Sequence, residues 1–121
     1  AALTLYPPVG EGGENELGLT ILCSAGEFDT LITGDMDSKT ERALLDAYPL
    51  PDIEVLLVGH HGSRYSTSEE LLETVTPEVG VVSVGSNSYG HPTRDALLRL
   101  TDAGVSVYRT DLQGNIHITV N

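Results

Sequence analysis

LLVGHHGSRYS, residues 56–66, is an apolar run that stops abruptly at two adjacent histidines. The run begins in IEVLLVG (53–59), a continuous apolar segment of the kind that predicts a strand covered on both faces. A glycine and a string of small polar residues follow His60 and His61. The stretch therefore places two imidazoles where a buried strand meets solvent.

Other strand-like runs and three helical patterns lie on both sides of this stretch. Turn residues separate the strand-like runs LTLY (3–6), LGLTILCS (17–24), FDTLITG (28–34), VGVVSVG (79–85), VSVYRT (105–110) and IHITV (116–120). Helices are predicted at 38–48, 68–75 and 93–104, the first two from the capping boxes Ser38–Glu41 and Ser66–Glu69. The turn AGE (25–27) predicts a hairpin, and the turn DLQG (111–114) predicts that the last two strands close the chain as a pair. A hairpin followed by three helix–strand units predicts an α/β layered fold with helices packed on a sheet.

The composition restricts the class of protein. The chain has 121 residues, of which 40% are hydrophobic, which suits one domain or a piece of one. Its 18 acidic and 6 basic residues give a formal charge of -12, which repels polyanions and, taken alone, argues against nucleic acid as a partner. The single cysteine, Cys23, excludes an internal disulfide and a cysteine-only metal site, and we expect it to be a buried thiol. No apolar run approaches the roughly 20 residues needed to cross a bilayer.

Side chains with chemical function follow three of the predicted strands. Asp35 ends TLITGD, His60 and His61 follow VLLVG, and His91 lies a short loop beyond VGVVSVG. Ligands collect at the carboxyl ends of strands in layered α/β folds, so we expect these side chains to share one edge of the sheet. Carboxylate oxygen and imidazole nitrogen are ligands that suit zinc, manganese or iron. The pattern therefore indicates a metal site.

Each of these residues also has a structural interpretation. Asp35 or Asp37 can cap the helix that follows, and the histidine pair can form a turn whose rings bond the backbone. His91 precedes a proline and can be an exposed loop residue. His117 alternates with two isoleucines, so it points away from the core and is interpreted as structural.

Other catalytic chemistries fit the sequence less well. No G-x-S-x-G pentapeptide, P-loop or GxGxxG motif occurs. Ser63 follows the histidines in a glycine turn, where it caps the turn or bonds a bound phosphate. One carboxylate and two or three histidines fall short of two metal ions, since a catalytic zinc alone needs about three protein ligands. Half of a metal site is visible.

Four segments carry a resemblance to a known family. TLITGDMDSKTERALL (30–45), VLLVGHHGSRYSTSEELLETVTPEVGVVSVG (55–85), NSYGHP (87–92) and VYRTDLQGNIHI (107–118) resemble the C-terminal half of the metallo-β-lactamase superfamily. They are most similar to the hydrolase domain at the end of the ComEC-type competence proteins, which take up DNA. The resemblance covers nearly the whole chain, and it is specific because TGD, HHGS, YGHP and RTDLQG occur in that order and spacing.

The resemblance implies a centre with two divalent metal ions, zinc or manganese. It matches Asp35 to the aspartate that bridges both ions, and one histidine of the pair, preferably His61, to a ligand of the second ion. The remaining implied roles are catalysis beside the substrate's phosphate for His60 and His91, and substrate binding for Ser63 and Asn87. Asn15 falls where relatives carry an Asn-rich loop, but Glu16 and Leu17 stand where an Asn–Ser pair is common.

The family's H-x-H-x-D-H motif, which supplies most of the metal ligands, is absent from the chain. It belongs N-terminal to Ala1, so residues 1–121 are expected to form the C-terminal half of an αββα sandwich, a mixed sheet with helices on one face. Without its other half, the isolated fragment is expected to bind metal weakly and to show little or no nuclease activity. It is also expected to self-associate through the sheet or to fold only marginally.

The resemblance implies part of a metal-dependent phosphodiesterase or nuclease in a bacterial DNA-uptake protein. Its partners would be single-stranded DNA and the remainder of the same membrane protein, of which this chain is a soluble domain on the extracytoplasmic side. The acidic charge leaves two alternatives open. One is a hydrolase of a small phosphoester such as phosphorylcholine, and the other is a non-catalytic structural or interaction module.

Overall fold

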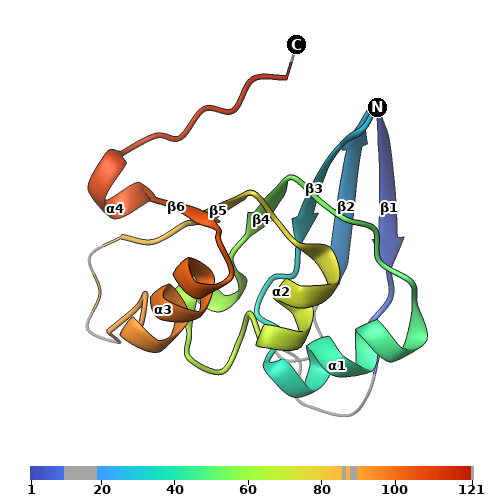
Figure 1. The fold of residues 1–121 in the computed structure, drawn as a ribbon, viewed down its shortest axis with the longest axis horizontal. Helices are drawn as coiled ribbons and strands as arrows, with labels where there is room; N and C mark the ends of the chain where they lie inside the picture. Colours follow the sequence, from blue (N-terminus) through green and yellow to red (C-terminus); the bar gives the residue numbers. More distant parts are fainter. Residues whose placement is uncertain (10–18, 86, 88–89, 121) are drawn as a thin grey trace.

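The computed structural model describes residues 1–9, 19–85, 87 and 90–120 (Figure 1). Its strands are β1 (Ala2–Tyr6), β2 (Thr20–Ala25), β3 (Phe28–Ile32), β4 (Val55–Leu57), β5 (Val79–Val82) and β6 (Ser106–Arg109). Its helices are α1 (Ser38–Ala47), α2 (Glu69–Val75), α3 (Arg94–Asp102) and the short α4 (Thr110–Gln113), with a 3₁₀ turn at Gly59–Gly62. The predicted hairpin and the three helix–strand units that follow it are confirmed.

The strands form one six-stranded mixed sheet in the order β1-β2-β3-β4-β5-β6. β1, β2 and β3 pair antiparallel, and the β2–β3 hairpin closes with Ala25 opposite Phe28 and with Gly26 at a φ of 63°. From β3 onward the pairing is parallel, because each connection passes through a helix or turn before returning to the sheet. The predicted α/β fold with a mixed sheet is confirmed.

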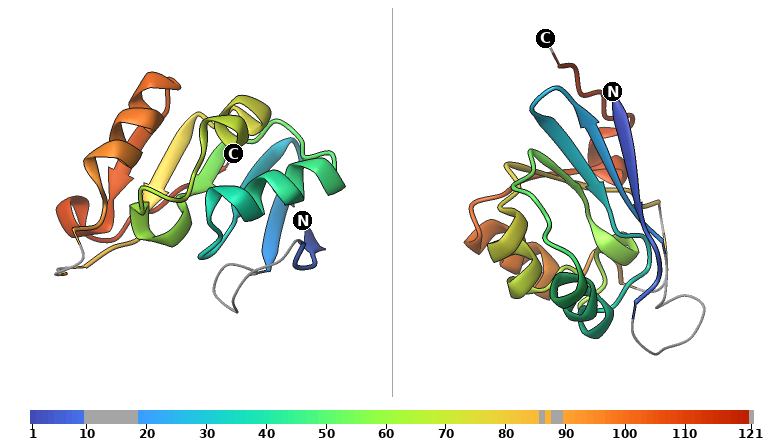
Figure 2. Two further views of the ribbon diagram at one scale, coloured as in Figure 1. Left: turned by 90° about the horizontal axis from the view of Figure 1, so that it is seen from below. Right: turned by 90° about the vertical axis from the view of Figure 1, so that its right-hand side faces the viewer.

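The two faces of the sheet differ in cover. One face carries Leu22, Leu31 and Leu56, which are register neighbours and are buried in a core with side chains from α2 and α3. Helices α1, α2 and α3 lie on this side of the sheet (Figure 2). On the other face, Leu3 and Leu5 of β1 are 70% and 58% exposed. The sheet therefore has one helix-covered face and one apolar face that no helix of the described residues covers.

Cys23 lies on the uncovered face and is half-buried, which corrects the expectation of a buried thiol. Its register partners are Leu3 on β1 and Thr30 on β3. Within the described residues only its helix-facing neighbours, such as Leu22, are buried.

The two predicted capping boxes are wrong in their cap residues. Asp37, not Ser38, caps α1, because its Oδ1 accepts the N–H of Thr40 at 2.9 Å. Ser68, not Ser66, caps α2, and its hydroxyl accepts the N–H of Leu71 at 3.2 Å. Glu41 and Ser66 of the predicted boxes make tertiary hydrogen bonds instead.

The predicted strand pair at the C-terminus does not form. Residues 111–113 of DLQG lie in the helical turn α4, where the side chain of Gln113 accepts the backbone N–H of Arg109 at 2.7 Å. Arg109 also holds Asp111 in an ion pair at 2.7 Å, and Gly114 leaves the turn at a φ of 72°. The alternation of IHITV predicted a strand, but residues 116–120 pair with no strand of the described residues. A strand requires a partner, and α4 directs the chain away from the edge of β6.

Candidate functional site

The candidate residues lie at the carboxyl ends of three adjacent strands. β3, β4 and β5 run parallel, so their last residues, Ile32, Leu57 and Val82, lie at one edge of the sheet. The segments that leave this edge carry Asp35, then His60 and His61, and then Asn87 and His91. The expectation that these side chains belong to one edge agrees with the topology.

The histidine turn has an unusual backbone. His60 and His61 both adopt left-handed conformations, with φ of 49° and 52°. Such conformations cost about 1–2 kcal/mol per non-glycine residue, and strained residues of this kind cluster at functional sites. Hydrogen bonds on both sides hold the turn, from the His60 N–H to the Gly34 carbonyl at 2.8 Å and from the Ser63 N–H to the His60 carbonyl at 3.0 Å. The first of these bonds ties the histidine turn to the residue just before Asp35.

Asp35 lies in an exposed turn between β3 and α1. Gly34 precedes it with a φ of 65°, a conformation that favours glycine. Asp37 rather than Asp35 caps α1, so capping does not account for Asp35. Its match to a bridging metal ligand stays a prediction.

The His61 ring is oriented by a backbone carbonyl. Its Nδ1 lies 2.6 Å from the carbonyl oxygen of Ser83. A carbonyl oxygen only accepts, so Nδ1 carries the hydrogen, and in the neutral ring Nε2 presents its lone pair. Metal-bound histidines are commonly held in this way, with the second ring nitrogen donating to a carbonyl or carboxylate. The arrangement makes His61 a better candidate for a metal ligand than His60.

His60 and His91 face each other beside His61. Their ring centroids are 5.6 Å apart, and those of His60 and His61 are 6.5 Å apart. Burial lowers the pKa of His91, and the charges of His60 and then His61 lower it further. The three rings thus gather at one edge, and His91 favours its neutral form near pH 7.

Hydrogen bonds to two loops hold His91 in place. Asn87 donates through Nδ2 to the His91 carbonyl at 2.8 Å and accepts the His91 N–H through Oδ1 at 3.1 Å. After the cis His91–Pro92 peptide, Thr93 donates its N–H and its hydroxyl to the Gly62 carbonyl at 2.9 and 3.0 Å. The loop after β5 is therefore fastened to the end of the histidine turn.

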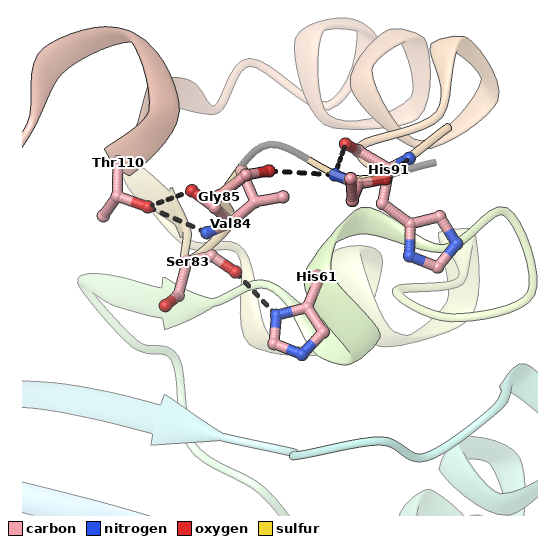
Figure 3. A pocket seen from close by; sticks show the side chains of 7 residues that line it. His61, Ser83, Val84, Gly85, His91 and Thr110 are labelled. Carbon is pink, nitrogen blue, oxygen red and sulfur yellow. Dashed lines mark hydrogen bonds between the residues drawn. The ribbon is translucent and has the colours of Figure 1, made fainter. Parts of the chain in front are cut away.

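A cavity of about 320 Å³ opens between these groups (Figure 3). It is lined by His61, Ser83, Val84, Gly85, Asn87, His91 and Thr110. Thr110 fixes the lining segment at Val84, because its hydroxyl donates to the Val84 carbonyl and accepts the Val84 N–H, both at 2.8 Å. Sequence reasoning missed Ser83, which acts through its backbone carbonyl, and Thr110, which acts through its hydroxyl. The RTD segment after β6 was the available signal for Thr110.

Two residues assigned to substrate binding make structural contacts. The hydroxyl of Ser63 accepts the N–H of Tyr65 at 3.2 Å, and Ser63 is buried. The amide of Asn87 bonds the backbone of its own loop. Their roles toward substrate stay predictions. Asn15 lies outside the described residues, and His117 is exposed, in agreement with its structural interpretation.

A buried carboxylate supports the loop that follows the histidines. Glu41 of α1 is fully buried and accepts the N–H groups of Thr67 at 2.6 Å and Ser68 at 2.9 Å. Burial raises the pKa of Glu41, against the opposing effect of these hydrogen bonds and of Arg99. Thr67 in turn accepts the N–H of Gly59, directly before the histidines, through its hydroxyl at 3.1 Å. Local pattern assigned Glu41 to a capping box, so sequence reasoning missed this role.

The donors at the edge fit a metal ion in kind but not in number. Aspartate and an oriented imidazole are ligands of zinc and manganese. Within residues 1–9, 19–85, 87 and 90–120, however, no three His, Cys, Asp or Glu side chains gather closely enough to hold a metal ion. A catalytic centre of the usual kind requires more donors than this edge supplies by itself.

The chain is similar to segments of three bacterial proteins. It is 34% identical over 104 residues to ComE operon protein 3 of Bacillus subtilis, which covers 85% of this chain and 13% of that protein. It is 42% identical over 92 residues to competence protein ComA of Neisseria gonorrhoeae, a match that covers 74% of this chain and 13% of that protein. It is 37% identical over 106 residues to recombination protein 2 of Haemophilus influenzae, a match that covers 87% of this chain and 13% of that protein. No family model matches the chain. It is thus homologous to a short part of much longer proteins.

No helix in the described part of the chain is long and apolar enough to cross a bilayer.

Proposed function

We propose that this chain is part of a bacterial competence protein and that it supplies one side of a metal-dependent phosphodiesterase centre. The similarity to a Neisseria protein named for competence supports the first part. One observation above all supports the second, namely that Nδ1 of His61 bonds the Ser83 carbonyl and leaves the lone pair of Nε2 available to a metal ion. The strained turn that holds His61 gives additional support.

Asp35 and His61 are the residues proposed to hold divalent metal, with Asp35 bridging two ions. Bound metal lowers the pKa of water and neutralises the charge that develops on phosphorus. His60 and His91, whose ring centroids are 5.6 Å apart, are proposed to bind the phosphate and to move a proton at its leaving oxygen. Ser63 and Asn87 shape the loops that hold these rings.

The missing metal ligands are proposed to come from another segment of the same protein, carrying an H-x-H-x-D-H motif. That segment would form the second sheet of an αββα sandwich and cover the apolar face where Leu3 and Leu5 are exposed. The whole would be a domain of the metallo-β-lactamase superfamily, attached to a membrane protein on its extracytoplasmic side and acting on single-stranded DNA.

The test distinguishes the roles of the two ring nitrogens of His61, and it uses the full-length protein that contains this chain. His61→Asn keeps a donor for the Ser83 carbonyl and tolerates the left-handed backbone, but it removes Nε2. We expect this variant to fold normally and to lose manganese, whereas the matched variant His60→Asn retains manganese and loses hydrolysis. Manganese content after dialysis and hydrolysis of bis(p-nitrophenyl) phosphate are the measurements. Full manganese occupancy in His61→Asn would contradict the assignment.

The isolated 121-residue chain provides a second test. It should bind zinc or manganese weakly and hydrolyse little or no DNA, because it lacks most of the metal ligands. A tight, stoichiometric dinuclear centre in this chain, measured by metal analysis after dialysis, would contradict the proposal of a half-site.

The charge of -12 favours one alternative substrate, a small phosphoester. Comparing hydrolysis of phosphorylcholine esters with hydrolysis of single-stranded DNA by the full-length protein distinguishes the two. If neither is hydrolysed and no metal binds, the chain is a structural or interaction module.

A further inference from the structure

The basic residues of this acidic chain are unevenly placed. Three of the six, Arg42, Arg64 and Arg99, line one open hollow of about 270 Å³ beside α1, α2 and α3. Arg99 is committed to structure, because it donates to the carbonyls of Arg64, Ser66 and Thr67 at 2.9, 2.9 and 3.1 Å. Arg42 and Arg64 are exposed and form no ion pair with any described residue. Two cations are therefore available to an external anion.

An exposed aromatic ring adjoins these cations. Tyr65 is 67% exposed, and the guanidinium carbon of Arg64 lies 5.9 Å from the centre of its ring. The backbone beneath the ring is fixed, since the Tyr65 carbonyl accepts the Ser38 N–H at 2.6 Å and the Tyr65 N–H donates to Ser63 at 3.2 Å. The loop thus holds a large apolar ring in solvent on a rigid backbone.

The exposed groups continue directly from the histidine edge. Ser63, which precedes Arg64 and Tyr65, is bonded through its N–H to the His60 carbonyl at 3.0 Å. The next residue, Ser66, donates its hydroxyl to the Met36 carbonyl, one residue beyond Asp35, at 2.5 Å. A ligand that spans the loop would therefore pass from the histidines over Tyr65 toward Arg42.

We propose that Tyr65, Arg64 and Arg42 form a binding track for single-stranded nucleic acid beside the histidine edge. Proteins hold single strands by stacking bases on aromatic rings and pairing phosphates with cations, and the track offers both within one loop and the adjoining α1. A duplex is disfavoured, because its bases are stacked on each other and do not reach the ring. This inference rests on the proposed function and deepens it, since it places the substrate strand beside two available cations of an acidic chain.

Equilibrium binding of a fluorescein-labelled oligothymidylate to the 121-residue chain tests the track, with EDTA present so that metal contributes nothing. The double variant Arg42→Gln/Arg64→Gln should lower the slope of log K against log salt by about 1.4, from roughly 0.7 for each phosphate contact on a single strand. If the wild type and the double variant bind equally at 1 M salt, this change in slope makes the variant bind about 25-fold more weakly than the wild type at 0.1 M salt. Tyr65→Ala should weaken binding by at least about fivefold without changing the slope, and Tyr65→Phe should restore it.

Matched controls come from β6. Arg109→Gln removes a guanidinium that is already paired with Asp111, and Tyr108→Ala removes an exposed ring that lies outside the track. Both should bind as the wild type does. Glu69 and Glu70 also line the hollow, so Glu69→Gln/Glu70→Gln should tighten binding. Wild-type chain that fails to bind the oligonucleotide at low salt overturns the proposal, as do track variants that bind like the wild type. Preference for vesicles of phosphatidylserine with no effect of Tyr65→Ala also overturns it and indicates a membrane surface.

These outcomes are separable from the fate of the proposed function. Hydrolysis of bis(p-nitrophenyl) phosphate by the full-length protein depends on the metal site and needs no track. Normal hydrolysis with unaltered strand binding in the track variants overturns the track alone. Loss of strand binding in those variants, with no hydrolysis by the wild type, supports the track and contradicts the phosphodiesterase.

Discussion

Glu41→Gln tests whether the buried carboxylate stabilises the loop after the histidines. The two oxygens of Glu41 have separate partners, since Oε2 accepts the Thr67 N–H at 2.6 Å and Oε1 accepts the Ser68 N–H at 2.9 Å. Glutamine has nearly the same shape but only one oxygen. Its amide nitrogen would face a backbone N–H, so one buried donor would lose its acceptor.

The expected cost follows from two opposing effects. A buried donor without a partner costs about 1–3 kcal/mol, while removal of a buried charge returns part of that free energy. We therefore expect Glu41→Gln to lower the free energy of unfolding by about 1–2 kcal/mol at pH 7. Glu69→Gln, on the exposed side of α2, should change it by less than about 0.5 kcal/mol.

The pH dependence provides a second measurement on the same pair of proteins. Burial raises the pKa of Glu41 in the folded chain above its ordinary value. A raised folded pKa contributes stability that is complete below the unfolded pKa and is lost as the pH rises through the folded pKa. Glutamine does not titrate, so the stability difference between wild type and Glu41→Gln should narrow as the pH rises from about 4. Urea unfolding followed by circular dichroism measures it, and a difference that is absent or that widens with pH would refute the reasoning.

Three further substitutions have defined outcomes. Asp37→Ala should lower the free energy of unfolding by about 0.5–2 kcal/mol, while Asp37→Asn keeps the cap. Hydrogen bonds from the first turn of α1 lower the pKa of Asp37. The stability difference between wild type and Asp37→Ala should therefore be present above about pH 4 and be lost as the pH falls through the lowered pKa. Gly62→Ala places a Cβ 2.4 Å from a proline side-chain atom at a φ of 85°, so thermal unfolding should reveal a larger loss than in Gly26→Ala, which shares the positive φ but meets no atom within 4 Å. Leu3→Glu should reduce self-association of the isolated chain in sedimentation experiments, whereas Leu98→Glu, on the exposed side of α3, should not. A strictly monomeric wild-type chain would contradict the prediction that the chain self-associates through the uncovered face of the sheet.

The order of elements could be predicted because each signal is local. Continuous apolar runs such as VLLVG predict buried strands, and prolines 49, 77 and 92 lie near helix boundaries. The two capping boxes were predicted wrongly, since Ser66 and Glu41 satisfy the local pattern but bond partners 30 and 26 residues away. The prediction of a strand at IHITV is wrong for a related reason. Alternation of apolar and polar residues indicates a strand, but it does not indicate whether a sheet edge is available for pairing.

The edge shared by the candidate residues could be predicted, but the geometry at that edge could not. Asp35, His60 and His91 each follow an apolar run, so their common edge follows once β3, β4 and β5 are parallel. The bond from His61 to the Ser83 carbonyl depends on how the loops leaving β4 and β5 approach each other. No pattern in the sequence reports that distance, nor the left-handed backbone of two adjacent histidines.

The strained backbone and the surrounding hydrogen bonds are two aspects of one arrangement. Left-handed His60 and His61 would relax if the turn stood alone, at a gain of about 1–2 kcal/mol each. Gly34 restrains the turn from β3, Thr67 from the loop before α2, and Thr93 from the start of α3. Because Glu41 fixes Thr67, a residue of α1 contributes to the position of an imidazole that it does not touch. Loss of any one restraint should therefore shift the His61 ring relative to Asp35 before it unfolds the sheet.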